Sequence, residues 1–277
     1  MRSLLTSALA LGLALPALAE ETILTLDGGI AATFNLPEAD GPVPGVLMLH
    51  GFGSTRDEVG NMYADAAAAL AEAGIASLRI DFQGFGKSGG DTGDHTVTRQ
   101  NADAALGLDA LMAMEGVDPD RIGVLGFSFG GGAAIELAAA RPDDVDSLVT
   151  WSSVGDYDVD FLQSLGERAF QMAEADGIVG LDLGWRTMAL KAAFFDSLSQ
   201  SEILDGLAAY EGPYLTITGS EDYYVRYSEP MAAAAGGEDV ERVVIEGADH
   251  IFNVFDPATS TAGEVIDTTA SRFAATL

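Results

Sequence analysis

Short apolar segments alternate with amphipathic segments from Val43 to the end of the chain, and this alternation constrains the fold more than any other feature. The apolar segments have the length and continuous hydrophobicity of buried strands, whereas the others show helical periodicity. Such alternation is typical of a mostly parallel sheet covered by helices on both faces. The expected strands are residues 43–50, 75–82, 121–127, 145–153, 213–220 and 240–247, and the expected helices are 58–74, 98–115, the Ala-rich run ending at 140, 224–236 and 257–276.

Two earlier apolar segments follow a different pattern. "ETILTLDG" (21–28) and "GIAATFNLP" (29–37) are short and are joined by Asp27-Gly28-Gly29. Asp-Gly and Gly-Gly between two apolar segments are typical of the turn of a β-hairpin. We therefore expect the α/β class, with a doubly wound, mostly parallel sheet and an antiparallel N-terminal hairpin at one edge.

One stretch is too long for a simple crossover between strands. Residues 154–207 separate two expected strands and contain helical patterning in "FLQSLGERAFQMAEADG" and "WRTMALKAAFFDSL". We interpret this stretch as a cap inserted over the carboxyl ends of the strands. Its large apolar side chains are Phe161, Phe170, Met172, Trp185, Met188, Phe194 and Phe195.

The N-terminus has the pattern of a secretory signal peptide. A short basic start at Met1 and Arg2 precedes an apolar run from residue 4 to residue 15, and Ala17-Leu18-Ala19 resembles a cleavage site. A membrane anchor is the alternative, but the run is shorter than the ~20 residues that a spanning helix needs. We expect residues 1–19 to be a signal peptide, residues 20–277 to be one domain with the cap at 154–207, and the protein to be periplasmic or secreted.

Charge and cysteine content limit the partners. The chain has no Cys and a formal net charge of −30. Such a surface repels nucleic acid and anionic headgroups, so we expect neither a nucleic-acid partner nor stable membrane insertion. The acidity is also compatible with a saline environment, where salt screens the repulsion between like charges.

A candidate nucleophile follows the expected strand 121–127. Gly126-Phe127-Ser128-Phe129-Gly130 is a G-x-S-x-G sequence placed between a strand and a helix, which is the context that a nucleophile elbow requires. In such an elbow a tight turn projects the Ser hydroxyl from the sheet. A glycine-rich turn at a helix start is the alternative without catalysis.

A Ser hydroxyl needs an adjacent base to act as a nucleophile. The chain has three histidines, and only His250 comes after Ser128, in the order Ser, acid, His that this motif follows. His50 ends an expected strand beside glycines, where a structural hydrogen-bonding role is expected. His95 follows "GGDTGD", which we interpret as a solvated loop because it lacks the ligand spacing of a calcium loop.

The imidazole needs a carboxylate to hold its tautomer. Asp222 lies between Ser128 and His250, in the loop after the expected strand 213–220, and Glu221 next to it is the rival. Asp249 adjoins His250 in sequence and is badly placed to reach back to the ring.

Backbone N–H groups are expected to stabilise the oxyanion. The first is that of Phe129, after the nucleophile, and the second comes from the loop after strand 43–50, where Phe52 in His50-Gly51-Phe52-Gly53 is the expected donor.

These blocks in this order resemble the α/β-hydrolase family. "LHGFGSTRDE", "RIDFQGFGKSGGD", "GFSFGG", "GSEDYYV" and "GADH" are most similar to its capped serine esterases, which include feruloyl and cinnamoyl esterases and bacterial carboxylesterases. The resemblance covers most of residues 22–277. It implies the α/β-hydrolase fold, a triad of Ser128, Asp222 and His250, and oxyanion donors at Phe52 and Phe129.

The leading hypothesis is a serine hydrolase that cleaves small carboxylic esters with an apolar acyl or aryl group. Neither a metal nor an organic cofactor is required by this chemistry. A peptidase or amidase using the same three residues is one alternative, and a ligand-binding protein without catalysis is another.

Overall fold

The computed structural model describes residues 20–277, so the expected signal peptide at 1–19 lies outside the described residues. Within residues 20–277, eight strands form one sheet in the order β1-β2-β4-β3-β5-β6-β9-β10. Neighbouring strands from β4 to β10 are parallel, whereas β2 pairs antiparallel with both β1 and β4. The strands are β1 (Glu20–Thr25), β2 (Ala31–Leu36), β3 (Val43–Leu49), β4 (Ala76–Ile80), β5 (Val117–Phe127), β6 (Ser147–Trp151), β9 (Tyr214–Gly219) and β10 (Val240–Ile245).

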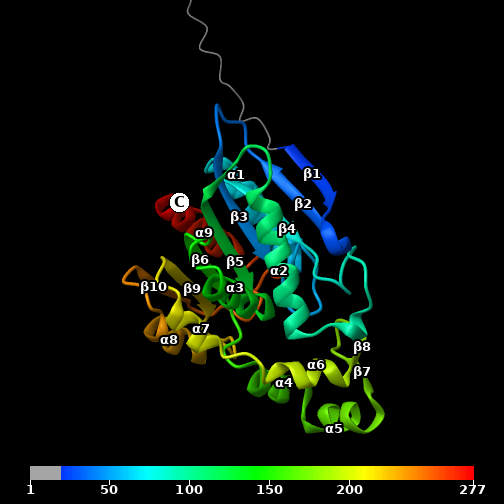
Figure 1. Ribbon diagram of the computed structural model, residues 1–277. Coiled ribbons are helices and arrows are strands. Elements are labelled where there is room, and N and C mark those ends of the chain that lie inside the picture. The colour runs from blue at the N-terminus through cyan, green and yellow to red at the C-terminus, as the bar shows by residue number, and fades with distance from the viewer. Residues whose placement is uncertain (1–19) are drawn as a thin grey trace, which may run out of the picture.

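The predicted N-terminal hairpin is confirmed. β1 and β2 pair in antiparallel register from Glu20 opposite Leu36 to Thr25 opposite Ala31. Gly28 and Gly29 occupy the turn with φ values of 74° and 75°, which side chains other than glycine rarely adopt. The hairpin forms one edge of the sheet, as Figure 1 shows at the blue end of the chain.

Helices cover both faces of the sheet (Figure 1). α1 packs against α9 on one face, and α2, α3, α7 and α8 lie on the other. The predicted doubly wound arrangement is therefore confirmed. These helices are α1 (Met62–Glu72), α2 (Val97–Met112), α3 (Phe129–Ala140), α7 (Ile203–Ala209), α8 (Val225–Ala234) and α9 (Ala262–Thr276).

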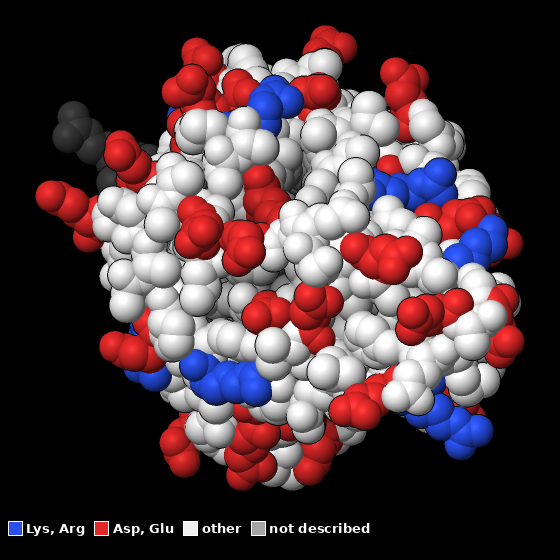
Figure 2. Space-filling view, turned by 60° about the horizontal axis from the view of Figure 1, so that its bottom comes forward, with Lys and Arg blue, Asp and Glu red and all other residues white. Residues whose placement is uncertain are grey.

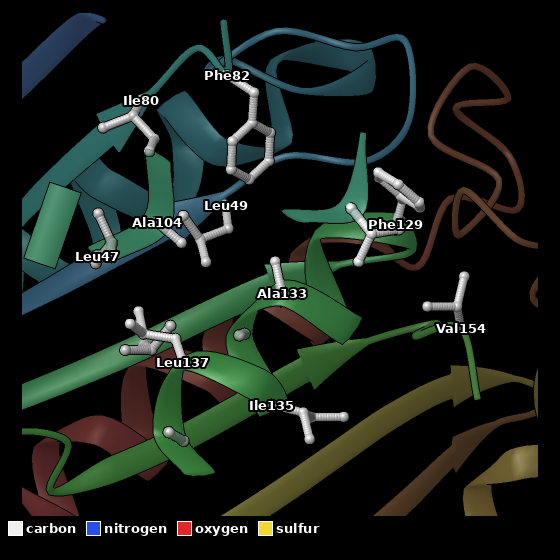
Figure 3. Close-up of a cluster of buried hydrophobic side chains, with 14 of the residues drawn as sticks. Leu47, Leu49, Ile80, Phe82, Ala104, Phe129, Ala133, Ile135, Leu137 and Val154 are labelled. Carbon is white, nitrogen blue, oxygen red and sulfur yellow. The ribbon is translucent and has the colours of Figure 1, made fainter. Parts of the chain in front are cut away.

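Strand β3 explains why this sheet must be covered on both sides. Leu47 and Leu49 pack with α2 and α3, and the alternate residues Val46 and Met48 pack with α1 and α9, all of them fully buried. A strand buried on both faces is continuously hydrophobic, as this sequence is. Figure 3 shows the first of these clusters, in which α3 directs Ala133 toward Leu49.

Helix α1 begins four residues later than the sequence predicts. Glu58 and Asn61 have φ values of 61° and 62°, and Gly60 has a φ of 58°. These left-handed conformations cannot belong to a right-handed α-helix. The predicted helix 58–74 is therefore wrong over its first turn, and Glu58 belongs to the loop after β3.

The segment between β6 and β9 forms the cap, which lies at the bottom of Figure 1. Its elements are α4 (Tyr157–Leu165), α5 (Glu167–Asp176), β7 (Ile178–Asp182), β8 (Thr187–Lys191) and α6 (Ala192–Leu198), after which α7 leads back to the sheet. The helix expected from Trp185 onward is wrong over 187–191, which is strand β8 paired antiparallel with β7. Met188 and Leu190 are buried while their neighbours are exposed, so this segment follows the two-residue period of a strand.

The strand register brings the candidate site residues to one edge of the sheet. Leu49 is opposite Gly126, and Phe127 is opposite Trp151, so His50 and Ser128 both leave the sheet at the same level. Gly219 and Ile245 are likewise paired at the ends of β9 and β10. Among residues 20–277 no helix has both the length and the apolar character needed to cross a membrane.

Candidate active site

Ser128 occupies a strained turn between β5 and α3. Its φ of 55° and ψ of −117° lie outside the regions that a residue with a side chain normally adopts. Three backbone hydrogen bonds hold this conformation: the Ser128 N–H donates to the Trp151 carbonyl at 2.9 Å, and the Ser128 carbonyl accepts from Gly131 at 3.0 Å and Val154 at 3.1 Å. The turn therefore fixes the direction of the Ser128 side chain, which is 8% exposed.

The two glycines of the motif permit this turn because α3 passes close to the sheet. A Cβ on Gly126 would lie 2.7 Å from the Cβ of Ala134, and one on Gly130 would lie 2.7 Å from the carbonyl carbon of Leu49. Neither contact leaves room for a methyl group. The two aromatic residues of the motif are also packed. Phe127 stacks on His250, and Phe129 packs in the hydrophobic core together with Phe161 of the cap.

His250 and Asp222 continue a line of hydrogen bonds from Ser128. The His250 Nε2 lies 3.1 Å from the Ser128 Oγ, and the His250 Nδ1 lies 3.1 and 3.2 Å from the two carboxylate oxygens of Asp222. A carboxylate only accepts, so Nδ1 carries the proton and Nε2 is left to accept from the hydroxyl. Asp222 is 3% exposed, whereas Glu221 is exposed.

Two loops hold the carboxylate and the imidazole together. The Glu221 N–H donates to the Ala248 carbonyl at 2.9 Å, which ties the loop after β9 to the loop after β10. The Tyr224 N–H donates to the Asp222 carboxylate at 3.1 Å. The imidazole is packed by two rings, with centroids of Phe127 at 5.2 Å and Tyr224 at 5.0 Å.

Two backbone N–H groups beside Ser128 have no protein acceptor within residues 20–277. They belong to Phe52, in the loop after β3, and to Phe129, the first residue of α3. The first N–H groups of a helix have no partner inside the helix. The Phe52 and Phe129 rings pack edge to face at 5.4 Å, which keeps these two residues together. The pair can therefore donate to an anionic oxygen on a group bound at Ser128.

Glu58 supports the loop that carries Phe52, a role that no sequence motif indicates. One carboxylate oxygen accepts from the Gly51 N–H, and the other accepts from the Ser54 hydroxyl and the Val59 N–H, both at 2.8 Å. Burial raises the pKa of Glu58, while these donors oppose that shift. A carboxylate in this position fixes the turn that follows Gly51.

The other two histidines are structural. The His50 Nε2 accepts from the Phe82 N–H at 3.0 Å, and its Nδ1 donates to the Gly51 carbonyl at 2.8 Å. The expectation of a solvated loop is wrong for His95, which is fully buried against Phe85 at 4.7 Å. The Thr92 hydroxyl donates to the Gly84 carbonyl, and the Gly84 N–H donates to the Gly89 carbonyl. These hydrogen bonds fold the loop inward. Burial lowers the pKa of His50 to about 4 and that of His95 to about 3.

Two cavities meet at Ser128. The cap cavity, of about 450 Å³, extends beneath the cap and is lined by Phe129, Phe161 and Tyr224. The loop cavity, of about 410 Å³, extends between the loops after β3 and β10. Both also border Phe52, Ser128, Trp185 and His250.

Some of the expected cap side chains line these cavities, others pack in the core, and Met172 is exposed. Phe161 and Trp185 line the cap cavity. By contrast, Phe170 and Phe195 pack against each other at 4.8 Å. In the described part of the chain, no three His, Asp or Glu side chains converge in a way that could hold a metal ion.

The family model and two of the relatives found by sequence each match about half of the chain. A family model described as serine aminopeptidase, S33, matches residues 41–175. An uncharacterized 31.7 kDa protein of Escherichia coli is 34% identical over 134 residues, or 48% of this chain and 46% of that protein. Esterase FrsA of Klebsiella pneumoniae is 33% identical over 138 residues, or 48% of this chain and 31% of that protein. The chain spans less than half the length of these curated relatives.

The comparison of structures covers nearly the whole chain. Est1E from Butyrivibrio proteoclasticus, solved with ferulic acid bound, superposes with a TM-score of 0.75 at 22% identity. The match covers 92% of this chain and 99% of that one. At this identity the likeness is evidence about the fold alone.

Proposed function

We propose that this chain is a hydrolase of the α/β-hydrolase superfamily and that it cleaves carboxylic esters through an acyl-enzyme on Ser128. One observation carries the proposal. A Ser in a strained strand-to-helix turn lies 3.1 Å from an imidazole whose other nitrogen faces a buried carboxylate. This arrangement supplies a nucleophile, a base and a group that orients the base.

The proposed reaction begins with proton transfer. His250 accepts the Ser128 proton at Nε2 as the hydroxyl oxygen attacks the ester carbonyl carbon. The carbonyl oxygen becomes an anion, which the N–H groups of Phe52 and Phe129 stabilise. Asp222 stabilises the imidazolium by accepting from Nδ1.

The tetrahedral species then collapses. The bond to the alcohol oxygen breaks, and His250 returns its proton to that oxygen, which leaves the acyl group on Ser128. A water molecule, deprotonated by His250, then attacks the acyl carbon. The bond from that carbon to the Ser128 oxygen breaks, and His250 returns the proton to this oxygen, which releases the carboxylic acid and restores the hydroxyl. We propose an apolar acyl or aryl group, because Phe129, Phe161 and Trp185 line the cap cavity.

The experiment is hydrolysis of p-nitrophenyl esters by purified protein. We expect Ser128→Ala to abolish turnover, and Ser271→Ala, an exposed change on α9, to leave it unaltered. Full activity of Ser128→Ala, or no hydrolysis of any ester by the unaltered protein, would refute the proposal.

An amidase is a second candidate because the matching family model is described as a serine aminopeptidase. The same three residues serve either reaction. The name of the matched FrsA relative favours esters. Turnover of an ester and an amide with the same acyl group compares the two, and we expect the ester to be strongly preferred.

We also propose that the protein is exported, since residues 1–19 have the signal-peptide pattern. N-terminal sequencing of the full chain expressed in a bacterial host tests this, with Glu20 as the expected first residue. Acidic side chains are spread over the face that carries the cap, and basic ones are few there (Figure 2). We therefore expect neutral small molecules, and neither nucleic acids nor anionic membranes, as partners.

A further inference from the structure

Ser128 lies at the junction of the cap cavity and the loop cavity. One cavity would be enough to hold the acyl half of an ester, so the second needs an explanation. Their volumes are similar, about 450 and 410 Å³. Both fall within the roughly 300–1,000 Å³ that is typical of small-molecule sites. An ester carbonyl bonded to Ser128 carries two groups, the acyl chain and the alcohol, which leave the carbonyl carbon in different directions.

His250 borders both cavities, so the residues that lie beyond it distinguish them. The departing oxygen takes its proton from the His250 Nε2, so the alcohol must lie on the His250 side of the carbonyl. The wall of the loop cavity continues from His250 into Ile251 and Phe255. The wall of the cap cavity instead continues from Phe129, whose N–H faces the carbonyl oxygen, into Phe161.

The side chains of the loop cavity select a neutral, apolar group. Val59, Phe127, Ile251 and Phe255 provide apolar walls. The polar side chains there are already paired, because the Ser54 hydroxyl donates to Glu58 at 2.8 Å. The Glu58 carboxylate would repel an alcohol that carries its own carboxylate.

Two large aromatic side chains at this cavity remain exposed to solvent. Phe255 is 72% exposed and Trp185 is 65% exposed, and they come from the loop after β10 and from the turn between β7 and β8. Covering apolar surface is worth about 25 cal/mol per Å². An apolar alcohol bound in the loop cavity would cover part of both rings.

We propose that the loop cavity binds the alcohol half of the ester, so that preferred substrates carry a sizeable apolar or aryl group on both sides of the scissile bond. This inference rests on the proposed esterase function. It assigns the acyl half to the cap cavity and the alcohol half to the cavity lined by Val59, Ile251 and Phe255.

The first test varies only the alcohol. Ethyl, butyl and hexyl butanoate have the same acyl group and leaving groups of nearly equal acidity, so their hydrolysis in a pH-stat reports binding of the alcohol chain. Since burying each added methylene in an apolar cavity is favourable, we expect kcat/KM to rise roughly 10- to 100-fold from ethyl to hexyl. Equal kcat/KM for all three would overturn the inference while leaving the esterase function intact.

Variants test whether the alkyl chain of the alcohol binds in the loop cavity. Phe255→Ala should lower kcat/KM for hexyl butanoate roughly 10-fold and leave ethyl butanoate within about twofold. Val59→Trp, which fills the loop cavity, should do the same. Ile23→Ala, at an exposed apolar residue on β1, is the control and should change neither substrate.

A reciprocal series separates the two halves. Ethyl butanoate and ethyl octanoate differ only in the acyl chain, so Phe255→Ala should not alter the ratio of their kcat/KM values. A changed ratio would show that the loop cavity holds the acyl group and would overturn the assignment. Failure of the unaltered protein to hydrolyse any of these esters would instead refute the proposed function.

Discussion

Replacing His95 with leucine should make the protein less sensitive to acid. His95 is fully buried against the rings of Phe85 and Phe129, and burial lowers its pKa from 6.5 to about 3. His50 is also buried, with its pKa lowered to about 4. Both rings are therefore neutral in the folded protein at pH 5, while in the unfolded chain both are protonated.

The sign and size of the effect follow from these pKa values. A lowered folded pKa means that the unfolded chain binds the proton more tightly, so this part of the stability is complete above pH 6.5 and is lost as the pH falls toward 3. Between pH 7 and pH 5 each of these two histidines should cost about 2 kcal/mol of unfolding free energy. His95→Leu removes one of these costs and places an apolar side chain among aromatic rings.

Urea denaturation at pH 7 and pH 5 measures the effect. The loss of unfolding free energy between the two pH values should be about 2 kcal/mol smaller for His95→Leu than for the unaltered protein. Comparing the two losses cancels the contributions of the carboxylates, which are common to both proteins. Equal losses, or a larger loss in the variant, would refute the reasoning.

Three further predictions concern the site. Gly126→Ala should lower the unfolding free energy in urea by ~1–3 kcal/mol, because its Cβ would overlap α3, whereas Gly263→Ala at an open position in α9 should not lower it. Asp222→Asn should reduce kcat for p-nitrophenyl esters by a factor on the order of 10⁴ and Glu221→Gln should not; equal effects would contradict the observed pairing. Glu58→Ala removes the acceptor of the Gly51 N–H and so should lower kcat more than it alters KM, by up to ~10²-fold, and unchanged steady-state kinetics would show that the Phe52 loop does not need it.

The overall fold could be predicted because the central strands are buried on both faces. Continuous apolar runs such as 43–50 leave few alternatives to a covered parallel sheet. Because the carboxyl ends of parallel strands share one edge, residues that follow strands in the sequence come together. This is why the sequence could predict that Ser128, Asp222 and His250 lie together, although Ser128 is more than 90 residues from the other two. Their hydrogen-bonded arrangement is observed, and their catalytic roles remain predictions.

The features that could not be predicted from the sequence depend on tertiary contacts. The segment at 187–191 has enough helix-forming residues to suggest a helix, but its two-residue burial pattern appears only once β7 pairs with it. His95 follows a Gly/Asp-rich stretch typical of solvated loops, and it is buried only because that loop folds back on itself. The sequence predicts a helix at Glu58 because nothing local reveals that its carboxylate accepts from the N–H groups of Gly51 and Val59.

The most direct test of the central claim is the mass of the protein after reaction with a fluorophosphonate, which traps an activated Ser. We expect one adduct, on the peptide that contains Ser128, and loss of esterase activity in proportion to its formation. Ser128→Ala should take up no label. No adduct, an adduct on a different residue, or full ester turnover by the labelled protein would contradict the claim.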